Sequence, residues 1–155
     1  MERRNGHESV WCFAESFTGR SLQVSLASHV LSFGRMGDVV TAEQFRRLAL
    51  SFPKALESSH MNHPDFRVRG GKIFATLAYP DTKWGMVKLT PEQQEEFVRA
   101  EPEVFEPVPG GWGRGGATRV RLAKAKKEIL KPAMAAAWCN AAPKKLAREF
   151  EAGRK

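Results

Sequence analysis

The residues best suited to binding chemistry stand in a glycine-rich segment of the chain's second half. Five of the seven residues from 110 to 116 are glycine, and the other two are Trp112 and Arg114. Glycine lets the backbone approach a ligand closely, while an indole and a guanidinium suit stacking and phosphate contact. The segment runs into residues 117–122, where Arg119 and Arg121 alternate with apolar residues. We therefore predict a flexible turn that enters a strand with one cationic face.

Basic residues alternate with apolar ones in two further segments. Residues 66–69 place two arginines opposite two apolar side chains, and Trp84, Met86 and Lys88 share one face of a predicted strand at 84–89. Basic side chains from several strands can converge on one surface that contacts phosphates regardless of sequence, with a tryptophan stacking on a base. The spacing leaves open an ordinary solvated sheet face with partly buried tryptophans.

Two other motifs match cofactor chemistry only formally. Gly111, Gly113 and Gly116 have the spacing of the dinucleotide fingerprint, but that fingerprint follows a strand and opens a helix, and here it precedes a predicted strand. Residues 60–65 hold two histidines and an aspartate, yet turn chemistry accounts for them and no further cluster completes a metal site. We expect no cofactor, no metal and no catalytic residue.

Composition predicts one globular domain with an anionic partner. The chain has 155 residues, 42% of them hydrophobic, which is enough for one core and too few for two domains of usual size. The formal net charge is +8, and residues 114–155 carry 12 Lys and Arg against 3 Asp and Glu. This uneven charge favours nucleic acid or a phosphorylated ligand, and a solvated lysine-rich helix is the alternative.

Cysteine usage and hydropathy bear on the compartment. Cys12 and Cys139 match no paired spacing, which fits a reducing cytoplasm, and no apolar run approaches the roughly 20 residues that a membrane span needs. We expect a cytoplasmic protein without a membrane partner, and a monomer is favoured.

Patterning divides the chain into two parts. Residues 1–37 lack clear periodicity, and Met36 offers an alternative translation start. We expect residues 1–37 to form a poorly ordered extension, with Met36 as a candidate native start, and residues 38–152 to form the single domain.

Capping boxes and period-two patterns predict the elements of that domain. Thr41 opens a helix that ends at Pro53, and Thr90 opens one that ends at about Ala100. Strands are predicted within 57–60, 66–69, 72–79, 84–89 and 117–122, with a loop over 102–116. A helix follows from residue 126, with a start or kink at Pro132 and a break at Pro143.

Several segments carry a family resemblance in their order and spacing: residues 45–53, 57–60, 66–75, 87–92, 111–113 and 118–122. Together they resemble the MmcQ/YjbR-like family of small bacterial proteins over about residues 38–150. The resemblance implies a CyaY-like α/β (α+β) fold, a two-layer sandwich whose antiparallel sheet of about five strands packs against N- and C-terminal helices. It also implies a double-wing mode of DNA binding and transfers no active residue. Iron binding, known for frataxin-like folds, is not expected because Glu43 is the only acid of the first helix.

We therefore expect a DNA-binding protein without enzymatic activity. The predicted contacts are strand and loop residues that reach the phosphate backbone or stack on bases: Arg67, Arg69, Lys72, Trp84, Lys88, Trp112, Arg114, Arg119 and Arg121. One alternative is an enzyme or binding protein for a small anionic, phosphorylated ligand, held by Lys72, Arg114 and His60 between the sheet and the glycine-rich loop. Another is a protein-interaction module that uses the alanine-rich C-terminal helix.

Overall fold

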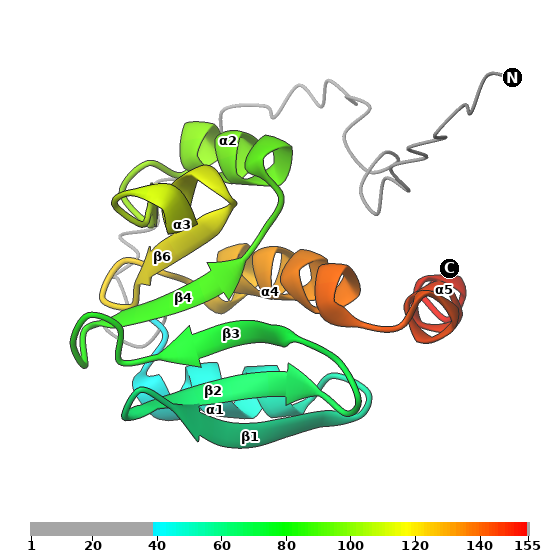
Figure 1. Ribbon diagram of the computed structural model, residues 1–155. Coiled ribbons are helices and arrows are strands. Elements are labelled where there is room, and N and C mark those ends of the chain that lie inside the picture. The colour runs from blue at the N-terminus through cyan, green and yellow to red at the C-terminus, as the bar shows by residue number, and fades with distance from the viewer. Residues whose placement is uncertain (1–38, 155) are drawn as a thin grey trace, which may run out of the picture. The chain divides into compact units, whose positions relative to one another are not determined.

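Six antiparallel strands form one sheet in the computed structural model, which describes residues 39–154. The strands are β1 (Ala55–His60), β2 (His63–Val68), β3 (Ile73–Leu77), β4 (Trp84–Lys88), β5 (Phe105–Pro107) and β6 (Ala117–Arg121). Their order across the sheet is β1-β2-β3-β4-β6-β5 (Figure 1). The extension predicted over residues 1–37 lies outside the described residues.

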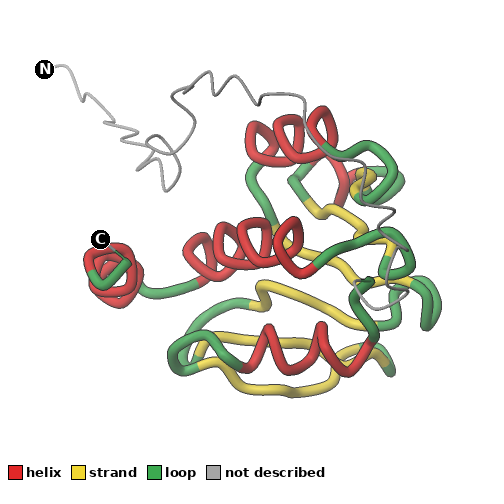
Figure 2. The backbone as a smooth tube through the Cα atoms, turned by 180° about the vertical axis from the view of Figure 1, so that it is seen from behind, coloured by secondary structure: helices red, strands yellow, loops and turns green. Residues whose placement is uncertain are grey.

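Helices form the second layer. They are α1 (Ala42–Leu50), α2 (Pro91–Ala100), the single turn α3 (Gly111–Arg114), α4 (Lys127–Ala141) and α5 (Lys144–Ala152). Figure 2 shows α1 and α4 side by side against the same face of the sheet. We call this the inner face and the opposite one the outer face. The predicted α+β two-layer sandwich is therefore confirmed, with six strands in the sheet instead of about five.

Both predicted capping boxes are present. Thr41 Oγ1 accepts a hydrogen bond from the Gln44 backbone N–H, and Gln44 Oε1 accepts one from the Thr41 N–H at 2.8 Å. Thr90 and Gln93 repeat this pair at the start of α2, where Pro91 occupies the first helical position. Each box satisfies backbone donors that the first helical turn leaves unpaired, so the sequence defines both helix starts.

The core lies between the inner face and the helices. Phe45, Phe66, Leu130 and Trp138 are fully buried in it. The alanines of α4 at positions 133 and 135–137 are also buried, which brings this helix close to β3 and β4. The alanine-rich stretch is therefore core and does not offer an exposed surface for a partner.

A bulge adapts β3 to this core. The pairing of β2 with β3 shifts between Phe66 and Arg67, because Phe66 lies opposite Ala75 whereas Arg67 lies opposite Ile73. The extra residue, Phe74, and its neighbour Ala75 are both fully buried. The bulge thus interrupts the strand alternation to bury a second side chain, and it leaves Arg67 on the outer face.

Some predicted boundaries are wrong. The predicted loop over 102–116 contains β5 and α3. The turn expected within residues 60–65 is confined to Met61 and Asn62, whose φ angles of 50° and 66° suit a two-residue hairpin turn, and residues 63–65 belong to β2. Pro132 lies inside α4, which begins before it at Lys127, whereas the predicted break at Pro143 separates α4 from α5. No helix within residues 39–154 has the length and apolarity to cross a bilayer.

Candidate nucleic-acid interface

Strand register brings part of the predicted site together on the outer face. Trp84 lies directly opposite Arg121, and Met86 lies opposite Arg119. The residues between them, Gly85 and Val120, face the core, because both are buried and the Phe45 ring packs against Gly85. Alternation therefore turns Trp84, Arg119 and Arg121 away from α1 and α4, onto the same face of the sheet.

These three residues form a closed cluster with Glu106 of β5, which we call the arginine cluster. Arg119 Nη2 lies 2.8 Å from Glu106 Oε1, and Arg121 Nη2 lies 3.5 Å from Glu106 Oε2. The Arg119 and Arg121 guanidinium carbons stand 5.3 and 4.9 Å from the centroid of the Trp84 ring, within range of a cation–π interaction. One carboxylate and one indole thus hold both cations, and both guanidinium groups lie over the Trp84 ring.

Arg67 is held in a second ion pair. Its Nε and Nη2 atoms donate to the two carboxylate oxygens of Asp65 at 2.6 and 3.0 Å, and Asp65 is fully buried. These hydrogen bonds raise the pKa of the Arg67 guanidinium. A buried carboxylate without its cation is costly, so the first role of Arg67 is to neutralise Asp65.

The four other predicted cations are exposed: Arg69, Lys72, Lys88 and Arg114. None of them forms an ion pair with an acid in the described part of the chain. Arg69 follows β2, Lys72 precedes β3, Lys88 ends β4 and Arg114 ends α3, just before β6. Because these strands are antiparallel neighbours, all four positions lie at one end of the sheet. We call this group the basic end.

Trp112 lies on α3, the short helix beside the basic end. Its side chain is 55% exposed. The Arg114 Nη2 atom lies 3.7 Å from the position that a Cβ atom would take at Gly111. The Lys88 Nζ atom lies 3.8 Å from the equivalent position at Gly115. The two cations therefore flank the helical turn that carries the exposed indole.

The glycine-rich segment differs from the predicted flexible turn. Residues 111–114 form α3, and the N–H of Gly115 bonds back to the carbonyl oxygens of Gly111 and Trp112 at 3.1 Å. A Cβ at Gly113 would collide with the Val108 carbonyl oxygen, and one at Gly116, whose φ is +91°, would collide with that of Leu89. These glycines serve close backbone packing, which fixes Trp112 on the fold.

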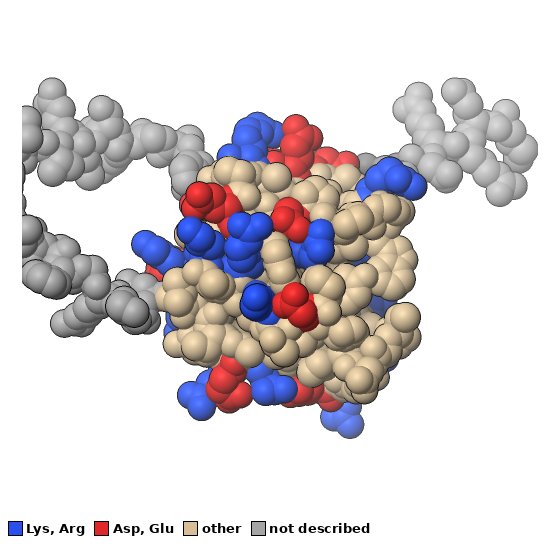
Figure 3. Space-filling view, turned by 90° about the vertical axis from the view of Figure 1, so that its left-hand side faces the viewer, with Lys and Arg blue, Asp and Glu red and all other residues tan. Residues whose placement is uncertain are grey.

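Figure 3 shows one side of the molecule, where Lys and Arg lie beside Asp and Glu and do not form an unbroken basic area. The arginine cluster likewise places Arg119 and Arg121 beside an acid, Glu106. Because opposite charges cancel over short distances, the basic end stands out through its lack of paired acids and not through the number of its cations.

Sequence reasoning missed Glu106. It lies on β5, between buried Phe105 and exposed Pro107. The apolar residues Val104, Phe105 and Val108 around it were a signal for a buried segment, but the prolines and glycines nearby favoured a loop. His60 and His63 pair across the β1–β2 hairpin, and no group of three or more metal-ligating side chains occurs among residues 39–154.

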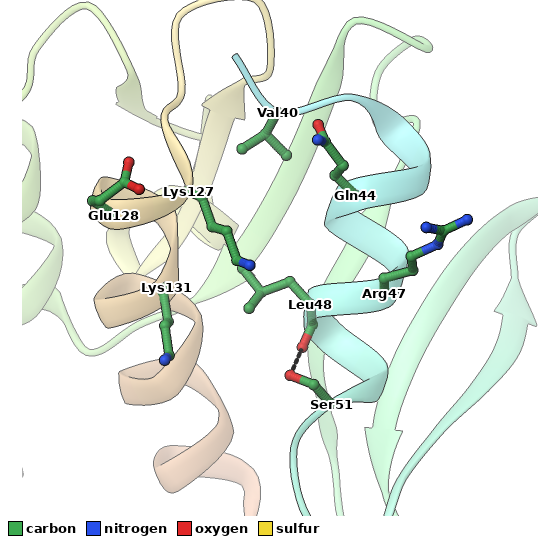
Figure 4. A pocket seen from close by; sticks show the side chains of 8 residues that line it. All are labelled: Val40, Gln44, Arg47, Leu48, Ser51, Lys127, Glu128 and Lys131. Carbon is green, nitrogen blue, oxygen red and sulfur yellow. Dashed lines mark hydrogen bonds between the residues drawn. The ribbon is translucent and has the colours of Figure 1, made fainter. Parts of the chain in front are cut away.

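A groove opens between α1 and α4 on the helical layer. Its volume is about 520 Å³, and its lining includes Val40, Leu48, Lys127 and Lys131. Figure 4 shows Lys127 reaching from α4 toward Leu48 of α1. An adjoining hollow of about 260 Å³ continues toward α5. Neither is lined by Lys72, Arg114 or His60, so the pocket predicted beside the glycine-rich segment is not one of these two.

Comparisons with known proteins agree on the kind of fold. The family model described as YjbR matches residues 50–143. The crystal structure of the Deinococcus radiodurans protein DR2400, which has a DUF419 domain, superposes with a TM-score of 0.55 over 66% of this chain and 78% of that one. The two sequences are 18% identical, so the likeness concerns the fold alone. No curated protein matches the chain in sequence.

Proposed function

The chain belongs to the YjbR family, and from this premise we propose that it is a DNA-binding protein without enzymatic activity. The observation that carries the proposal is the basic end, where four exposed cations without ion pairs in the described chain lie at one end of the sheet, two of them beside the short helix that carries an exposed tryptophan. Free cations gain most from phosphates, because no protein carboxylate has to be displaced first. The double-wing DNA binding implied by the family resemblance supports the same function.

The seven predicted cations then divide into two groups. Arg69, Lys72, Lys88 and Arg114 bind phosphates directly. Arg67, Arg119 and Arg121 contribute less, because each already pairs with a carboxylate. Contacts to phosphate position a protein on DNA without reading its sequence, so the proposed binding is largely sequence-independent.

Fluorescence anisotropy with labelled DNA over a salt series tests this proposal. Four phosphate contacts give log Kd a slope of about 3 to 4 against log salt. The double variant Lys72→Glu/Lys88→Glu should weaken binding strongly. Lys127→Glu/Lys131→Glu is the matched control, because it changes the charge equally but lies in the groove on the helical layer. Absence of binding at low salt, or equal losses in both variants, contradicts the proposal.

A second candidate function is binding of a small phosphorylated ligand in the groove between α1 and α4. Its volume is typical of small-molecule sites, and Lys127 and Lys131 supply two exposed cations beside the apolar Val40 and Leu48. Thermal shifts with phosphomonoesters test it. A ligand that stabilises the native chain but not Lys127→Glu/Lys131→Glu supports this candidate, and the absence of any stabilisation removes it.

A further inference from the structure

Three aromatic rings from separate parts of the chain lie in a row, which we call the ring row. The Trp112 ring of α3 is tilted by 33° against the Tyr79 ring, with 6.4 Å between their centroids. Tyr79 follows β3, and its ring meets the His63 ring of β2 nearly edge-on at 5.5 Å. These separations fall in the range of favourable aromatic pairs, so each ring supports the next.

The ring row ends in an open surface. Trp112 is the exposed member, whereas Tyr79 and His63 are half-buried. Close packing of Gly113 against Val108 and of Gly116 against Leu89 fixes the short helix that carries Trp112. The indole is therefore held in place before any ligand arrives, which lowers the entropy lost on stacking.

Two cations flank the turn that carries Trp112. The Arg114 guanidinium lies beside Gly111, and the Lys88 ammonium lies beside Gly115, at opposite ends of the turn that holds Trp112. An exposed aromatic ring combined with flanking cations is the usual arrangement for binding single strands. In a duplex the faces of the bases are already covered by their neighbours, so this ring has nothing to stack on there.

We propose that the ring row binds single-stranded DNA, with a base stacked on Trp112 and the adjoining phosphates at Lys88 and Arg114. This inference rests on the proposed function and narrows it to a class of substrate. The stacking is tolerant of sequence, since every base has a π-face.

The test compares three fluorescein-labelled probes of equal length: a single strand, the corresponding duplex, and an abasic strand that keeps the phosphates. The native chain should bind the single strand most tightly. Trp112→Ala should weaken that complex by about fivefold or more and leave the abasic complex unchanged, whereas Trp112→Phe should restore most of the loss. Met61→Ala is the control, because Met61 is an exposed apolar side chain at the β1–β2 turn.

The outcomes separate this inference from the function on which it rests. Duplex binding as tight as single-strand binding, or an equal loss for Trp112→Ala on the abasic probe, overturns the stacking inference and leaves DNA binding intact. Binding to none of the three probes at low salt overturns the proposed function itself. Circular dichroism of each variant establishes that it is folded.

Discussion

The guanidinium of Arg121 lies over the indole ring of Trp84, 4.9 Å from its centroid, and the two residues are direct partners across β4 and β6. Glu106, from the neighbouring strand β5, forms an ion pair with the same guanidinium at 3.5 Å. Trp84 and Lys88 begin and end β4 on the same face, about 13 Å apart at a rise of about 3.3 Å per residue. A DNA strand at Lys88 is thus within a few nucleotides of the arginine cluster.

Glu106 competes with phosphate for Arg119 and Arg121. We expect Glu106→Gln to free both guanidinium groups, to tighten DNA binding at low salt, and to steepen the salt dependence by about 1 to 2 in slope. Anisotropy over a salt series measures both effects. Glu103→Gln is the matched control, since Glu103 is exposed and stands 3.8 Å from Lys124. Equal gains in the two variants would show a general charge effect instead.

Arg67 stabilises the fold by pairing with buried Asp65. Arg67→Ala leaves that buried carboxylate without its two hydrogen bonds, so we expect the free energy of unfolding to fall clearly. Urea unfolding measures the change. Arg69→Ala, at an exposed position two residues along the chain, should change stability by less than about 0.5 kcal/mol. A small loss for Arg67→Ala would mean that water replaces the guanidinium at Asp65.

Gly113 has no room for a side chain. We expect Gly113→Ala to destabilise the protein by about 1 to 3 kcal/mol, because the new methyl group would collide with the Val108 carbonyl oxygen. Thermal unfolding checks this. In Gly115→Ala the methyl group would meet the Trp112 carbonyl oxygen at 3.4 Å, an ordinary contact, so the melting temperature should hardly change. If both variants melted like the native chain, α3 would not be packed as described.

Glu43 makes the stability of α1 depend on pH. Hydrogen bonds from Arg47 and Arg46 lower the pKa of its carboxyl group. The stabilisation is therefore complete above the unfolded-state pKa of about 4.3 and is lost as the pH falls through the lower folded-state pKa.

The corresponding variant is Glu43→Gln. It should be less stable than the native chain at neutral pH, and the two should converge in acid, as urea unfolding at several pH values would reveal. Glu96→Gln, at an exposed site of α2, serves as control. A stability difference that persists at the acid end would rule out this source of pH dependence.

Local signals allowed much of the fold to be predicted. Thr41 and Thr90 begin helices because each hydroxyl reaches a backbone donor three residues on, a contact contained within four residues of sequence. The alternation in β6 likewise predicted that Arg119 and Arg121 share the face opposite Val120. Such features depend only on near neighbours in the chain.

The parts that were mispredicted depend on distant contacts. β5 is three residues long, and it pairs with β6, which follows it after a helical turn. α3 contains two glycines in four residues, a poor helix former, and forms because the chain packs closely on Val108. Neither the Glu106 ion pairs nor the contact of Tyr79 with Trp112 could be predicted before the strand order was known.

The shortness of β5 also bears on how copies of the chain behave at high concentration. β5 is one edge of the sheet and ends in Pro107, whose nitrogen carries no hydrogen to donate. A strand from another molecule would find few backbone groups to pair with there. This edge is therefore a poor template for edge-to-edge aggregation, while Glu106 within it holds the arginines of β6.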